Sequence, residues 1–151
     1  MHAFTESIIT PMRKPFLRLG GLMALLAVAF GAFGSHGLKS AVDAASVNTF
    51  EIGVRYQFYH AFALLAVGLL LYWRKNKLLT AAGWLFLTGI LLFSGSLYLL
   101  ALSELFNLNT SALGPITPIG GVAFIAGWAC FILATFQKNE KSYRRKSSEE
   151  G

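Results

Sequence analysis

Charged residues are scarce in this chain, and acidic residues are the scarcest of all. Only 13% of the 151 residues are charged and only 7 are Asp or Glu, whereas about a quarter of a soluble domain is charged. No pair of carboxylates falls inside the long apolar segments. This argues against a proton-coupled drug exporter, because such proteins rely on an intramembrane acid.

Motifs of the common enzyme and metal-binding classes are also missing from the sequence. The single cysteine, Cys130, lies in an apolar segment, so no disulfide can form within the chain. There is no Cys-x-x-Cys, glycine-rich phosphate loop or nucleophile elbow. His36 and His60 lack the cysteine or carboxylate partners that a metal site needs. We therefore expect no cofactor, no metal and no enzymatic activity.

Long apolar segments dominate what is present. Hydrophobic residues make up 55% of the chain, and the mean hydropathy is +0.57. A helix needs about 20 mostly apolar residues to cross ~30 Å of hydrocarbon, and barrel strands would alternate with a period of two. Four segments qualify as helices, at about 17–37, 54–73, 78–102 and 117–136. The sequence predicts an all-α integral membrane four-helix bundle over 13–136, an N-terminal extension at 1–12 and a charged tail at 137–151.

Basic residues mark one side of this bundle. Of the 13 Lys and Arg residues, only Lys39 and Arg55 lie outside the N-terminal segment, the second connection and the tail. By the positive-inside rule, both termini are cytoplasmic and the protein lies in the cell inner membrane. The net charge of +6 then reflects topology and contact with membrane lipids, and not nucleic-acid binding. A cleavable signal peptide is the alternative for the first segment, and it would leave three spans.

Local patterns add detail to the bundle. Apolar residues at helical spacing over 38–45 predict a short interfacial helix between the first two spans. Asn48 followed by Glu51 resembles a capping box for the second helix. Small residues follow one face of the first and of the fourth span: Gly20, Ala24, Ala27, Gly31 and Gly34, and Ala123, Gly127, Cys130 and Ala134. Because small residues let helices approach closely, we expect spans one and four to pack together.

Polar motifs interrupt the apolar segments on the predicted non-cytoplasmic side, at 34–37, 55–60, 94–98 and 114–118. Antiparallel spans bring these ends together, so the sequence predicts one polar binding pocket in the outer leaflet. Its candidate residues are His36, Arg55, Tyr56, Gln57, Tyr59, His60, Ser94, Ser96, Tyr98 and Thr117.

Each of these candidates has a structural alternative. His60 can link neighbouring helices by hydrogen bonds, and the serines can bond to the backbone. Arg55 can contact a lipid phosphate or pair with Glu51, and the tyrosines can belong to an interfacial aromatic belt. The Gly-Pro-Ile-Thr-Pro motif at 114–118 can break the chain and restart the fourth helix.

At these motifs the chain resembles a small four-span bacterial inner-membrane family typified by YgdD and YwdK, with relatives among animal mitochondrial membrane proteins. The resemblance runs from about Met12 to Phe136 and rests on residues 31–38, 53–61, 93–98 and 113–121. Ser35 stands where the family pattern usually has Ala, which is a small-for-small exchange. The resemblance implies four spans and a membrane location, but no reaction, because the family's biochemical function is not established.

From these observations we expect a non-enzymatic protein that binds a lipid headgroup, a small amphiphile or a partner helix through the outer-leaflet pocket. Its expected partners are membrane lipids and a second copy of the chain or another membrane protein. The alternative is a transporter or channel in which His60 and Arg55 handle a proton or a small anionic solute. Such a protein would act as an oligomer, because four helices alone enclose little pore.

Overall fold

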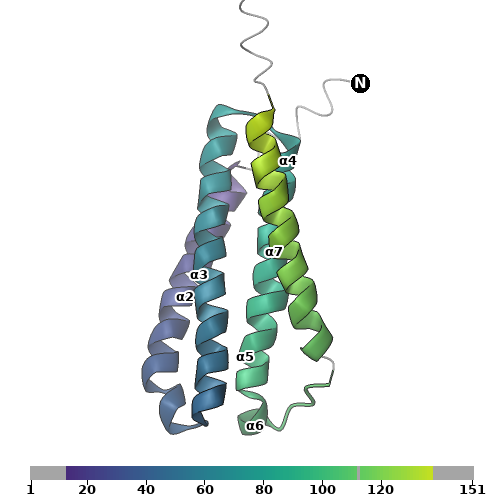
Figure 1. Cartoon of the computed structure of the whole chain (residues 1–151). Helices are drawn as coiled ribbons and strands as arrows, with labels where there is room; N and C mark the ends of the chain where they lie inside the picture. Colours follow the sequence, from purple (N-terminus) through teal and green to yellow (C-terminus); the bar gives the residue numbers. More distant parts are fainter. Residues whose placement is uncertain (1–12, 112, 138–151) are drawn as a thin grey trace, which may run out of the picture.

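The computed structural model describes residues 13–111 and 113–137, and the regular structure within these ranges is entirely helical. Figure 1 shows long helices running side by side. The order is α2 (Arg13–His36), η2 (Leu38–Ser40), α3 (Ala44–Trp73), α4 (Lys77–Gly89), η3 (Ile90–Ser94), α5 (Gly95–Ala101), α6 (Ser103–Phe106) and α7 (Leu113–Phe136). The predicted N-terminal extension and all but the first residue of the predicted tail lie outside the described residues.

Four segments are long and apolar enough to cross a membrane: Arg13–Ser40, Ala44–Trp73, Lys77–Ala101 and Leu113–Phe136. The predicted all-α four-span bundle is therefore confirmed. Both ends of the described chain lie at one end of the bundle, together with the α3–α4 turn (Figure 1). We call this the terminal end. The opposite end, which carries η2 and α6, is the loop end.

The predicted pairing of spans one and four is wrong. α2 packs mainly on α3, whereas α7 packs mainly on α4 and η3. The small residues do permit close approach, but large side chains of other helices fill the space beside them. Gly20 faces Leu65 of α3, and Gly127 faces Phe86 of α4. The small residues on one face of a helix thus indicate that another helix packs tightly there, which stabilises the bundle inside a membrane in place of the hydrophobic effect. They do not identify which helix it is.

Aromatic rings lie against glycines at several helix crossings. The pairs are Phe16 on Gly83, Phe124 on Gly89, Phe86 on Gly127 and Tyr98 on Gly53. Phe16 and Phe86 are fully buried and belong to one apolar cluster, which Phe124 also joins. Because glycine has no side chain, each ring can lie close to the opposite helix and gain dispersion contacts there. These contacts fill the interior of the bundle.

The third span departs from regular α-helix in its middle. Residues Ile90–Ser94 form a π-helical turn, in which the Gly95 N–H donates to the Ile90 carbonyl. Such turns are rare and widen the helix locally. At this level α7 comes so close that Gly120 lies against the Phe93 backbone. This turn was not predicted from the sequence.

The connection at the loop end is tighter than predicted. The interfacial helix is only the single 3₁₀ turn η2, because α3 already begins at Ala44. Asp43 caps α3 by accepting a hydrogen bond from the Ser46 N–H at 2.7 Å, and this bond lowers the pKa of Asp43. The predicted capping box at Asn48 and Glu51 is wrong, since both residues lie inside the helix.

Hydrogen bonds from the α3–α4 turn hold the terminal end together. The Asn76 side chain accepts hydrogen bonds from the first N–H groups of α4 and donates to Gln137 at 2.9 Å. The Arg74 guanidinium donates to the Ala134 carbonyl at 3.2 Å. These side chains therefore join the turn to the last part of α7 and to Gln137 directly after it.

Candidate functional site

The candidate site residues are distributed over internal contacts and the protein surface. Gln57, His60, Ser94 and Ser96 are buried. Tyr56 and Tyr59 are exposed side chains of α3, with 41% and 60% of their surface accessible, and Arg55 and His36 are exposed as well. The exposed tyrosines fit the aromatic-belt alternative. The structure thus brings some of these residues together in pairs and leaves others apart.

Gln57 links three spans through one amide group. Its Nε2 donates to the Met23 carbonyl of α2 at 2.8 Å, and its Oε1 accepts from the Tyr98 hydroxyl of α5 at 2.8 Å. Only 3% of the Gln57 side chain is exposed. In hydrocarbon an unpaired amide is costly, so these bonds favour the arrangement in which α2, α3 and α5 meet.

Replacement of Gln57 by Leu should lower the free energy of unfolding by about 1–2 kcal/mol, because the buried Tyr98 hydroxyl loses its acceptor. Tyr98→Phe should cost less, about 0.5–1 kcal/mol, because it leaves the Gln57 Oε1 unpaired but keeps the bond from Gln57 to the Met23 carbonyl. Unfolding in detergent measures both variants and the double variant. If the three-span link exists, the two losses are strongly non-additive. If the loss in free energy of unfolding of the double variant equals the sum of the two single losses, the link between Gln57 and Tyr98 is contradicted.

His60 is a neutral link between α3 and α7. Its ring lies flat on Phe124, with 3.4 Å between centroids and 10° between planes. Its Nε2 accepts from the Trp128 indole N–H at 3.3 Å. Because indole only donates, the proton is on Nδ1, which donates to the Tyr56 carbonyl at 2.8 Å. Both ring nitrogens are thus occupied.

His60 is enclosed by aromatic side chains. The predicted second span began near residue 54, whereas α3 begins at Ala44, so several helical turns precede His60. Only 5% of the residue is exposed, and Phe86, Phe124 and Trp128 surround its ring. A ring enclosed in this way has little access to water, which is consistent with a neutral histidine held by hydrogen bonds.

Ser96 and Thr117 join α5 to α7 near the loop end. Their hydroxyl oxygens lie 2.7 Å apart, and the Ser96 hydroxyl is also 2.9 Å from the Phe93 carbonyl. The Gly-Pro-Ile-Thr-Pro motif lies within the first turns of α7, which begins at Leu113. Ser94 is fully buried in η3, and its hydroxyl has no hydrogen-bond partner among the described residues.

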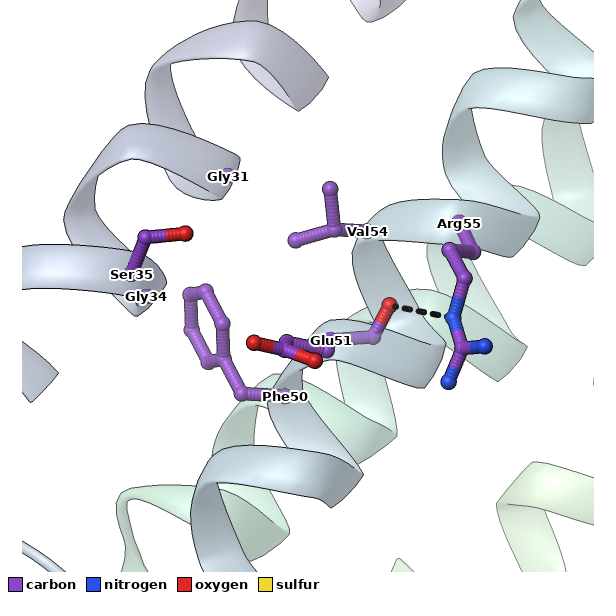
Figure 2. A pocket seen from close by; sticks show the side chains of 7 residues that line it. All are labelled: Gly31, Gly34, Ser35, Phe50, Glu51, Val54 and Arg55. Atoms are coloured by element: carbon purple, nitrogen blue, oxygen red, sulfur yellow. Dashed lines mark hydrogen bonds between the residues drawn. The ribbon is translucent and has the colours of Figure 1, made fainter. Parts of the chain in front are cut away.

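A surface groove runs between α2 and α3 near the loop end (Figure 2). Its volume is about 210 Å³. It is lined by Gly31, Gly34 and Ser35 of α2 and by Phe50, Glu51, Val54 and Arg55 of α3. Gly34 has no side chain to fill the space, and a Cβ there would come within 3.0 Å of the Phe50 ring. His36 follows Ser35 but does not line the groove.

The groove contains a cation, an anion and a hydroxyl group. In Figure 2 the Ser35 hydroxyl and the Glu51 carboxylate lie on the side of α3 that faces α2, whereas the Arg55 guanidinium extends along the other side of α3. The Arg55 Nε donates to the Glu51 backbone carbonyl at 3.4 Å. Within residues 13–111 and 113–137, Arg55 forms no ion pair, so the predicted pairing of Arg55 with the Glu51 carboxylate is not found. Its guanidinium remains available for an external anion.

Arg55 was predicted from the sequence as a site residue, whereas Glu51 was not. Glu51 and Arg55 are four residues apart, which places them on one face of α3. Gly31, Gly34 and Ser35 likewise share one face of α2. These two spacings would indicate the groove only together with the information that α2 packs on α3, which the sequence did not provide.

Four apolar helices of membrane-spanning length, tied by internal polar contacts, define a small four-span integral membrane protein. The chain belongs to the family described as "Protein of unknown function (DUF423)", whose model matches residues 30–121. The family predicted from the motifs is thereby confirmed.

Similar proteins share nearly their whole length with this chain. The UPF0382 membrane protein of Staphylococcus aureus (strain bovine RF122 / ET3-1) is 44% identical over 124 residues, which are 82% of this chain and 97% of the relative. The UPF0382 membrane protein YwdK of Bacillus subtilis (strain 168) is 44% identical over 126 residues, covering 80% and 95%. No solved structure matches significantly. The printed names of these relatives describe them as membrane proteins and name no reaction.

Proposed function

We propose that this protein is a non-enzymatic inner-membrane protein that binds the phosphate of a phospholipid headgroup in the groove between α2 and α3. The observation that carries the proposal is Arg55, which lines this groove and whose guanidinium forms no ion pair within the described ranges. Its flexible side chain can turn the guanidinium toward a phosphate bound there. A guanidinium matches a phosphate with two parallel hydrogen bonds. The acyl chains would lie along exposed apolar side chains of the spans.

The charge distribution supports an outer-leaflet groove. The terminal end carries Arg13, Lys14, Arg18, Arg74, Lys75 and Lys77. The loop end carries Lys39 and Arg55 together with the acidic residues Asp43, Glu51 and Glu104. By the positive-inside rule, this asymmetry favours a cytoplasmic terminal end and therefore cytoplasmic termini. The groove would then face the headgroups of the opposite leaflet.

The interior of the bundle favours binding over transport. Gln57, His60 and Ser96 are hydrogen-bonded to neighbouring helices. Phe16 and Phe86 are fully buried in the apolar cluster of the bundle. A solute path through one chain would have to displace these contacts. The transport alternative therefore requires a pathway between chains of an oligomer.

Arg55→Gln should reduce the phospholipid that copurifies with the protein about tenfold, because it removes a charge-assisted bond to phosphate. Native mass spectrometry of protein extracted in mild detergent measures the retained lipid. Lys39→Gln is the matched control, since it removes the same charge at the same end but does not line the groove. It should retain lipid at the wild-type level.

Two results would contradict lipid binding in the groove. One is a wild-type protein that carries no phospholipid under these conditions. The other is an equal loss in Arg55→Gln and Lys39→Gln, which would indicate general surface charge. Solute flux in proteoliposomes that disappears in Arg55→Gln would favour the transporter instead.

A further inference from the structure

We infer that the bound headgroup carries a primary ammonium beside its phosphate, as in phosphatidylethanolamine. This inference rests on the proposed function, because the phosphate is the group bound by Arg55. It starts from the second charged residue of the groove, Glu51, which the phosphate alone does not explain.

Glu51 makes the groove unsuitable for a purely anionic headgroup. Glu51 and Arg55 both line it, yet the Arg55 Nε bonds to the Glu51 backbone carbonyl and not to the carboxylate. Arg55 therefore does not neutralise the carboxylate by an ion pair. A headgroup with a net negative charge would be repelled there, whereas a zwitterion places its cation next to the carboxylate.

The remaining polar group of the groove fits an ammonium that can donate hydrogen bonds. A primary ammonium has three N–H donors, and both the Glu51 carboxylate and the Ser35 hydroxyl can accept them. A choline headgroup has the same charge but no N–H donor. The groove volume of about 210 Å³ is smaller than the usual 300–1,000 Å³ of small-molecule pockets. It thus suits a small headgroup.

The test compares three phospholipids with identical acyl chains: phosphatidylethanolamine, phosphatidylcholine and phosphatidylglycerol. Each is titrated into the purified full-length protein in detergent and followed by native mass spectrometry. We expect phosphatidylethanolamine to bind about tenfold more tightly than the other two lipids, because one additional charge-assisted hydrogen bond contributes about this much to affinity. In Glu51→Gln this preference should disappear while phosphatidylglycerol binds at least as well as before. Arg55→Gln should weaken all three.

Two further variants guard against a folding defect. Glu51→Asp keeps the charge and should keep a preference for phosphatidylethanolamine. Glu104→Gln removes an exposed acidic residue of α6 that does not line the groove, and should leave the order of affinities unchanged.

The outcomes separate this inference from the proposed function. Equal binding of the three lipids, or a preference that persists in Glu51→Gln, would overturn the ammonium contact and leave phosphate binding intact. A wild-type protein that binds none of the three lipids would overturn both.

Discussion

Gly120→Ala should lower the free energy of unfolding by about 3 kcal/mol, a large loss for the addition of one methyl group. A Cβ at Gly120 would lie 2.8 Å from both the Cα and the Cβ of Phe93, and closer still to its backbone nitrogen. Backbone atoms cannot rotate away as a flexible side chain can. The methyl group would therefore push α7 away from the π-helical turn η3.

Gly121→Ala is the matched control for this prediction. A Cβ at Gly121 would meet only the Phe93 ring, at 3.8 and 3.9 Å, which is ordinary van der Waals contact. We expect a change within about 0.5 kcal/mol, since alanine also has the higher helix propensity. Chemical or thermal unfolding in detergent compares the two variants. Similar losses at both positions would contradict the close approach of α7 to η3.

The spans could be predicted from the sequence because the membrane imposes a strong constraint. A segment in hydrocarbon must satisfy its own backbone hydrogen bonds, so length and hydropathy are enough to identify helices. All four predicted helices are present. The start of the second helix could not be predicted in this way, because Asp43 and Asn48 are both residue types that commonly cap helices. In the structure η2 ends at Ser40, and α3 begins directly after Asp43, which caps it.

Helix partners and the π-helical turn could not be predicted in the same way. The spacing of Gly20 or Gly127 shows which face of a helix is small, but not which large side chain fills the space. That choice depends on complementary shapes along two helices, such as Phe86 of α4 against Gly127 of α7. The π-helical turn at Ile90–Ser94 likewise has no simple sequence pattern.

The polar residues of the candidate site could be selected from the sequence by their type, but their contact partners could not. Gln57, Tyr98 and Thr117 are polar residues in apolar spans, and such residues usually bond to neighbouring helices. The structure supplies their partners. Glu51 was not selected, because an acidic residue near a loop resembles ordinary surface. It becomes part of a site only because glycines of α2 leave a groove beside it.

His60→Ala should lower the free energy of unfolding by about 3 kcal/mol, because it removes a buried ring and leaves a cavity against Phe124. It also leaves the Trp128 N–H without its acceptor. His60→Phe keeps a ring on Phe124 and should lose only about 1 kcal/mol. Tyr59→Ala is the control, since Tyr59 is 60% exposed, and it should have little effect.

The pair of His60 variants also separates a structural histidine from one that transfers protons. If His60 only links α3 to α7, proteoliposomes containing wild type and His60→Phe should show the same proton permeability, whatever their stabilities. Proton flux that is present in the wild type and absent from a folded His60→Phe variant would favour the transporter. The comparison must use His60→Phe, because His60→Ala would combine loss of a proton carrier with loss of packing. A stable His60→Ala protein would in turn contradict the stacked arrangement of His60 and Phe124.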